Sequence, residues 1–194
     1  MRKILIAMAP VVFLAACSSS GTDSTEAGIA SSPAITSSDY VTNNCAVVGG
    51  APTNSSVAPT SGATLDGVTV VTGKTPTVTI APALGAATEV VTKTLIPGKG
   101  ATLKATDVLT FNYCGVGLVT QSQFDSSWAN GAPITYGLAE LIPGWSVGMP
   151  GMKVGEQRLL ILPGSQAYGS TPPSSDILPD ESLAFVVELV SIQN

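Results

Sequence analysis

The clearest pattern of hydrophobic and polar positions lies in the second half of the chain, where alternation predicts β-strands. In the segment 108–114 the odd positions share one face of an extended chain and the even positions share the other. The odd set is Leu109, Phe111 and Tyr113, and the even set is Val108, Thr110, Asn112 and Cys114. Residue type and length predict further strands at 90–96, 158–162 and 183–192.

One short helix is predicted between these strands, at 142–149. Pro143 suits the first helical turn, and Pro150-Gly151 ends the segment. Mostly antiparallel strands with a single short helix are typical of an α+β arrangement, in which the sheet covers the helix.

The preceding segment, 64–88, is predicted to form a β-hairpin extension. Two β-branched runs, 68–71 and 77–80, are separated by the turn-like stretch 72–76. Eight of the ten aromatic residues lie between Phe111 and Phe185, and none lies between 41 and 110. We therefore expect the core in the second half of the chain and a peripheral hairpin.

The N-terminus has the pattern of an export signal over residues 1–16. Arg2 and Lys3 precede an uninterrupted apolar run of thirteen residues, which is shorter than the roughly 18 needed to span a bilayer. Leu14-Ala15-Ala16-Cys17 resembles the lipobox of bacterial lipoproteins, in which the cysteine becomes the lipidated first residue. The alternative is ordinary cleavage after a small residue. If Cys17 is lipidated, membrane attachment would depend on its acyl chains alone.

The composition after Cys17 predicts a flexible tether, and we assign residues 17–63 to the lipidated cysteine and a linker rich in Ser, Thr, Gly and Pro. Residues 18–38 contain eight Ser and no aromatic residue. A segment of this kind cannot bury enough apolar surface to fold alone.

Charge and composition exclude several classes of function. The 194 residues carry a net charge of −5 with 11 % charged residues, which leaves no basic patch for nucleic acid. The chain has no His, and its three Cys, at 17, 45 and 114, form no Cys-x-x-Cys pair. We therefore expect neither a metal nor a cofactor. An exported protein permits disulfides, so Cys45 and Cys114 either pair or remain two free thiols.

Seven short segments between residues 89 and 194 carry a family resemblance. They are Ile96-Pro97-Gly98-Lys99-Gly100, Phe111-Asn112-Tyr113-Cys114-Gly115, Phe124-Asp125-Ser126-Ser127, Leu141-Ile142-Pro143-Gly144-Trp145, Gly151-Met152-Lys153-Val154-Gly155-Glu156, Ala167-Tyr168-Gly169 and Leu183-Ala184-Phe185. In their order and spacing this region resembles an FK506-binding-protein (FKBP) type peptidyl-prolyl isomerase. The resemblance implies an antiparallel sheet half-wrapped around one short helix, with an apolar pocket for the proline ring between them.

The resemblance also implies roles for individual residues. Trp145 would be the floor of the pocket, Tyr113, Phe124 and Phe185 its walls, and Leu141, Ile142 and Ile177 further lining. The Ile142 N–H and the Tyr168 hydroxyl would donate to substrate carbonyl groups, with Asp125 at the rim. Ile134 stands where the family usually has an aromatic residue, and Tyr136 is the nearby ring that could replace it.

The function implied is cis-trans isomerisation of Xaa-Pro bonds in exported proteins, without a covalent intermediate. The alternative is a non-catalytic module or holdase that binds proline-containing segments in the same groove. We expect a monomer, anchored by lipid outside the cytoplasm of a bacterial cell and inhibited by rapamycin-type macrolides.

Overall fold

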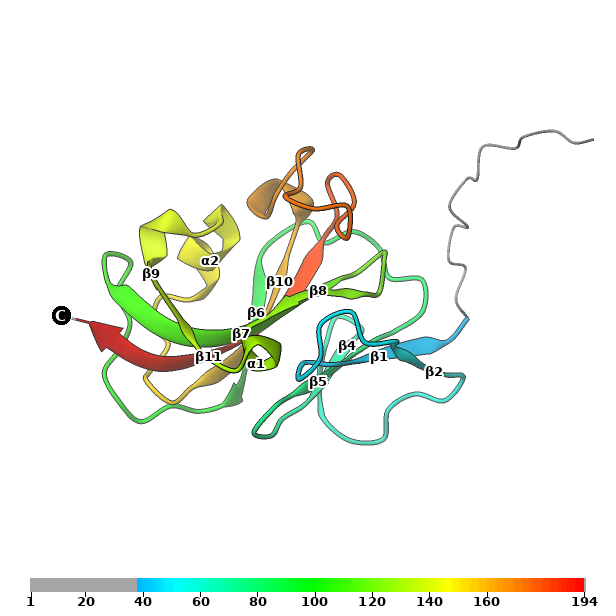
Figure 1. Ribbon diagram of the computed structural model, residues 1–194, viewed down its shortest axis with the longest axis horizontal. Coiled ribbons are helices and arrows are strands. Elements are labelled where there is room, and N and C mark those ends of the chain that lie inside the picture. The colour runs from blue at the N-terminus through cyan, green and yellow to red at the C-terminus, as the bar shows by residue number, and fades with distance from the viewer. Residues whose placement is uncertain (1–37, 194) are drawn as a thin grey trace, which may run out of the picture. The chain divides into compact units, whose positions relative to one another are not determined.

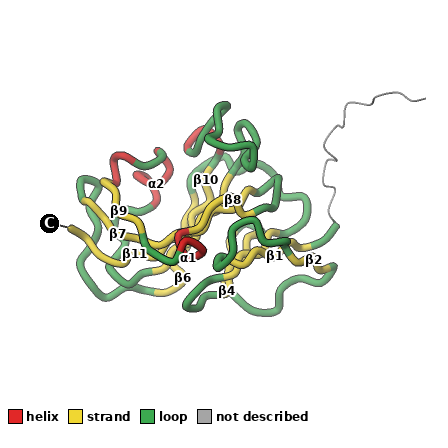
Figure 2. The backbone as a smooth tube through the Cα atoms, in the orientation of Figure 1, coloured by secondary structure: helices red, strands yellow, loops and turns green. Residues whose placement is uncertain are grey.

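The computed structural model describes residues 38–193, which form two antiparallel sheets and a few short helices (Figures 1 and 2). The predicted signal peptide, 1–16, and the predicted lipidation site, Cys17, lie outside the described residues. Within the described part of the chain, no helix is both long and apolar enough to cross a membrane.

The first sheet has five strands in the order β2-β1-β5-β4-β3. Their bounds are β1 Tyr40–Asn44, β2 Thr53–Ser55, β3 Ala63–Leu65, β4 Val68–Val71 and β5 Thr77–Ile80. The two runs predicted as a hairpin are β4 and β5, and they pair antiparallel. They are not a free-standing extension, however, because β1 pairs with β5 and β3 pairs with β4.

The structure corrects the expectation of a flexible linker as far as residue 63. Strand β1 alternates between partly exposed positions and the buried Val41 and Asn43, and Cys45 behind it is fully buried. The surrounding Ser, Gly and Pro residues hide this alternation, but they lie in the turns between β1, β2 and β3. The sheet therefore begins at Tyr40, and the composition of its turns is what resembles a linker.

The second sheet has the order β6-β10-β11-β7-β8, with β9 also paired to β7. Its strands are β6 Val91–Ile96, β7 Val108–Gly117, β8 Gln123–Ser126, β9 Ile134–Gly137, β10 Gln157–Leu162 and β11 Leu183–Gln193. Four of these confirm the strands predicted near 90–96, 108–113, 158–162 and 183–192. Strands β8 and β9 were not predicted because, unlike the equally short β4 and β5, they are not runs of β-branched residues.

Four short helices connect these strands. The α-helices are α1 Ser127–Asn130 and α2 Pro143–Gly148, and the 3-10 helices are η1 Leu138–Glu140 and η2 Gly164–Gln166. Helix α2 is the helix predicted at 142–149.

The second sheet has a core on each face. On the inner face, Leu109, Phe111 and Phe185 pack with Trp145 of α2. On the outer face, Cys114, Val116 and their neighbours pack against valines and Ile80 of the first sheet. The two predicted faces of strand β7 are therefore confirmed. The first sheet is not peripheral, because its Val68, Val70, Val78 and Ile80 are at most 1 % exposed.

Candidate active site

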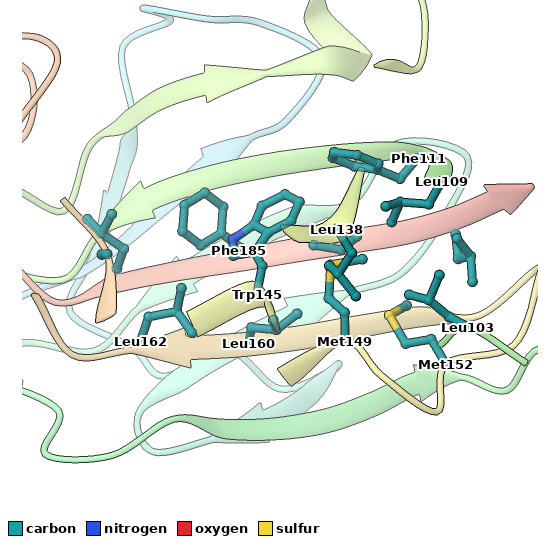
Figure 3. Close-up of a cluster of buried hydrophobic side chains, with 14 of the residues drawn as sticks. Leu103, Leu109, Phe111, Leu138, Trp145, Met149, Met152, Leu160, Leu162 and Phe185 are labelled. Atoms are coloured by element: carbon teal, nitrogen blue, oxygen red, sulfur yellow. The ribbon is translucent and has the colours of Figure 1, made fainter. Parts of the chain in front are cut away.

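The site is centred on Trp145, which helix α2 presents to the inner face of the second sheet (Figure 3). Pro143 occupies the start of α2, where its missing N–H costs no helical hydrogen bond. A Cβ on Gly144 would lie 2.7 Å from the side chain of Leu162, so only glycine lets α2 pack this closely on β10. The local sequence Pro-Gly-Trp thus places the indole against the sheet.

Three aromatic rings surround the indole edge-on. The centroid of Trp145 lies 5.1 Å from that of Phe111, 5.2 Å from Phe185 and 5.9 Å from Tyr113. The indole is 4 % exposed, and its N–H has no hydrogen-bond partner among the described residues. Edge-to-face contacts of this kind are favourable because the positive ring edge meets the negative ring face. The indole is therefore held by packing alone.

A cavity of about 250 Å³ opens above this aromatic group. It is lined by Phe111, Tyr113, Ile134, Glu140, Leu141, Ile142, Trp145, Tyr168 and Phe185. Seven of these nine were predicted as site residues, and they come from β7, β9, the turn between η1 and α2, α2 itself, β11 and the loop after η2. The cavity is thus a mostly apolar opening beside Trp145.

Phe124 and Asp125, from strand β8, complete the wall of the aromatic group. The ring of Phe124 lies 5.7 Å from that of Phe185 and 6.5 Å from that of Tyr168. Gly115 makes this possible, because a Cβ at that position would overlap the ring of Phe124. Phe124 packs against the buried cluster that contains Trp145, although it does not line the cavity itself.

Asp125 accepts a short hydrogen bond from the hydroxyl of Tyr113. Burial, followed by this hydrogen bond and the charge of Asp125, raises the pKa of Tyr113 well above its usual range. Burial and the same carboxylate also raise the pKa of Tyr168. Both phenols therefore stay protonated at neutral pH and act as hydrogen-bond donors.

Two of the predicted substrate-binding residues do not line the cavity. Ile177 is 4 % exposed and belongs to the buried cluster around Trp145. Tyr136 is 50 % exposed in β9, where it pairs with Leu109. Ile134 and Tyr136 are two residues apart and so share one face of β9, but only Ile134 lies where the strand borders the cavity.

Phe111 and Glu140 line the cavity without having been predicted as site residues. Phe111 lies two residues before Tyr113 on the same face of β7, so the alternation that marked Tyr113 applied to it equally. Glu140 ends η1 and accepts a hydrogen bond of 2.9 Å from the N–H of Gly137. Nothing in the local sequence distinguishes Glu140 from an ordinary surface acid.

An ion pair behind the site fixes the far end of helix α2. Arg158 lies 2.7 Å from Glu156, and its guanidinium also donates a 2.7 Å hydrogen bond to the carbonyl of Gly148. Gly148 is the last residue of α2. The pair is largely buried, so it ties the helix that carries Trp145 to strand β10.

The chemistry available to this arrangement is binding and orientation. The lining supplies apolar surface, phenol and backbone donors, and carboxylates at the rim. Among residues 38–193 there is no group of three or more His, Cys, Asp or Glu side chains that could hold a metal ion.

Comparison with known proteins identifies the family. The family model described as FKBP-type peptidyl-prolyl cis-trans isomerase matches residues 99–190. The FK506-binding protein of Streptomyces anulatus is 38 % identical over 103 residues, which cover 52 % of this chain and 83 % of that protein. The chain belongs to the FKBP-type peptidyl-prolyl cis-trans isomerase family.

Two further relatives support this assignment. FK506-binding protein 1 of Saccharomyces cerevisiae is 40 % identical over 99 residues, covering 50 % of this chain and 86 % of that protein. A crystal structure of a peptidyl-prolyl cis-trans isomerase from Pseudomonas syringae pv. tomato aligns with a TM-score of 0.50 at 28 % identity, over 56 % of this chain and 79 % of that one. The cavity-lining residues all lie within 99–190, whereas the first sheet lies outside this FKBP match.

Proposed function

We propose that the cavity above Trp145 binds the prolyl ring of an Xaa-Pro segment and accelerates rotation about its imide bond. The observation that carries this proposal is the cavity of about 250 Å³, open to one side and floored by an indole held edge-on by three rings. Ligand sites are typically concave and mostly apolar, with a few placed polar groups.

The reaction requires no covalent intermediate. Rotation about a peptide bond faces a barrier of about 18 to 20 kcal/mol, because resonance gives the C–N bond double-bond character. Twisting the bond removes that resonance and reduces the charge separation of the amide. An apolar cavity therefore favours the twisted form over the planar one, and preferential binding of the twisted form is catalysis.

Donors at the rim orient the substrate. The N–H of Ile142 lies at the position before α2, ahead of the helical hydrogen bonds, and would donate to a substrate carbonyl. The hydroxyl of Tyr168 would donate to a second carbonyl from the opposite side. Asp125 holds the hydroxyl of Tyr113 in place and transfers no proton.

The site and the compartment of the protein together suggest which proteins it acts on. The disulfide between Cys45 and Cys114 favours an oxidising compartment, as does the lipobox-like sequence that ends at Cys17. We therefore propose a monomeric, lipid-anchored isomerase that acts on proline-containing proteins folding outside the cytoplasm. Rapamycin-type macrolides are the expected inhibitors, since the relatives are named for binding FK506.

A protease-coupled assay on an Xaa-Pro peptide, with and without rapamycin, tests the function. We expect catalysis that rapamycin abolishes. Tyr168→Phe, which removes one hydrogen bond, should reduce kcat/KM by about two- to tenfold. Tyr40→Phe, a matched change in the first sheet, should leave kcat/KM unchanged. Binding of the peptide without any acceleration would instead support a non-catalytic module.

A further inference from the structure

We propose that strand β1 and the adjoining Cys45 position the residues behind the wall of the prolyl pocket by clamping strand β8 at both ends. The clamp consists of Asn43 and Cys45, and β8 carries Phe124 and Asp125. The inference rests on the proposed function of the pocket, because it assigns these two residues a role in isomerisation although they lie outside it. They are positioning residues, since they act through β8.

Asn43 holds the start of β8 with both ends of its amide. Its Nδ2 donates to the carbonyl of Gln121 at 3.0 Å, and its Oδ1 accepts from the N–H of Gln123 at 3.2 Å. Asn43 is only 3 % exposed, so these bonds are shielded from water.

Cys45 holds the other end of β8. Its carbonyl accepts a 2.7 Å hydrogen bond from the hydroxyl of Ser126, which is fully buried. Its side chain forms the disulfide with Cys114 of β7, the residue that pairs with Ser126 across the two strands. Cys45, directly after β1, is therefore fastened to both β7 and the end of β8.

Strand β8 needs such support because its own pairing is weak. It lies at the end of the sheet order and pairs with β7 at only three positions, with a register shift between Gly115 and Val116. Phe124 falls at this shift, opposite no partner. A bulge of this kind re-aims the side chain it carries. The direction of the Phe124 ring is therefore set by how Gln123 and Ser126, on either side, are held.

The clamp also reaches the hydrogen bond between Asp125 and Tyr113. Asp125 lies directly before Ser126, and Tyr113 directly before Cys114, so both ends of this hydrogen bond adjoin residues that Cys45 fastens. Loosening the clamp would shift the carboxylate and the Phe124 ring together. A displacement of about 1 Å in positioning groups can cost a factor of about 100 in rate.

The test replaces Asn43 and compares it with its neighbour. Asn43→Ala removes both side-chain hydrogen bonds, to Gln121 in the turn before β8 and to Gln123 at its start. Asn44→Ala, in the same strand, removes only a local bond from the N–H of Ala46. Thr69→Ala, which removes a hydroxyl contact with Thr64 inside the first sheet, serves as a control for loss of stability alone. Each full-length variant is assayed well below its melting temperature, with amide hydrogen exchange measured alongside.

We expect Asn43→Ala to lower kcat/KM by about tenfold and to speed amide exchange at Gln123–Ser126. Asn44→Ala and Thr69→Ala should stay within about twofold of the wild type, below the cost of one lost hydrogen bond. Unchanged exchange in β8, or equal losses of activity in Asn43→Ala and Thr69→Ala, would overturn the proposal.

A second variant keeps the proposal falsifiable if Asn43→Ala does not fold. Ser126→Ala removes the hydrogen bond to Cys45 with almost no change in volume, and the same two readouts apply. Amide exchange in β8 reports the clamp without any need for activity. An inactive wild-type protein would therefore count against the proposed function, whereas rigid β8 amides in the variants would count against the clamp.

Discussion

Removing the disulfide between Cys45 and Cys114 should cost a large part of the stability of the fold. The bond joins residues separated by 69 positions, so it restricts a long loop in the unfolded chain. Loop-closure entropy for that length corresponds to about 4 kcal/mol at 25 °C. Globular proteins have a free energy of unfolding of only about 5 to 15 kcal/mol. The double variant Cys45→Ala/Cys114→Ala should therefore remain folded but be much less stable.

Urea unfolding measures this loss directly. With a denaturant dependence of about 2 kcal/mol per molar, the midpoint should fall by about 2 M. Every protein compared would carry Cys17→Ser, so that no third thiol takes part. The Cys17→Ser parent should give the midpoint of the double variant once its disulfide is reduced; the reduction is done in denaturant because both cysteines are fully buried in the native state.

A loss of less than about 1 kcal/mol would refute this reasoning. It would mean that residual structure in the unfolded chain already restricts the loop between the two cysteines. A lower slope of the unfolding transition would reveal such residual structure.

Two further outcomes follow from buried polar groups. Glu181 is 4 % exposed and accepts hydrogen bonds from the N–H groups of Val119, Thr120 and Leu178. Glu181→Gln replaces one acceptor oxygen with an NH2 group that faces an N–H donor, so it should lower the free energy of unfolding in urea by about 2 to 4 kcal/mol. A loss near zero would show that these hydrogen bonds are replaceable. The raised pKa of Tyr113 means that, above a pH of about 10, the unfolded state loses a proton that the fold retains, so stability should fall with rising pH. Tyr113→Phe should flatten that fall between pH 9 and 11, and an unchanged slope would contradict the assignment.

The core sheet and its helix could be predicted from sequence because their patterns are local. The alternation along 108–114 and the apolar runs of β10 and β11 could be recognised without knowledge of distant residues. Pro143-Gly144-Trp145 marked helix α2 for the same reason. The bounds of these elements differ from the prediction by only a few residues.

The first sheet could not be predicted in full, because its short strands are stabilised by residues that lie far away in the sequence. Strand β1 is half polar, and Asn43 is buried only because Gln121 and Gln123 satisfy its amide. Its neighbours β2 and β3 have three residues each. Strands this short carry no periodicity, so composition decided the prediction and indicated a linker.

Most residues that line the cavity were named in advance through family resemblance, whereas Phe111 and Glu140 were not. Phe111 lines the cavity because β7 carries it two residues from Tyr113, a relation that alternation already contained. Ile177 is in the core instead, since the loop after η2 turns it inward. Loop residues lack the alternation that would have shown this.

The most direct test of the central claim is exchange spectroscopy on an Xaa-Pro peptide in the presence of a small amount of the protein. The account predicts cis-trans exchange signals that rapamycin abolishes. Saturating peptide should shift the indole N–H signal of Trp145, with that of Trp128, the only other tryptophan, unchanged. Peptide exchange no faster than in buffer, or a shift at Trp128 alone, would contradict it.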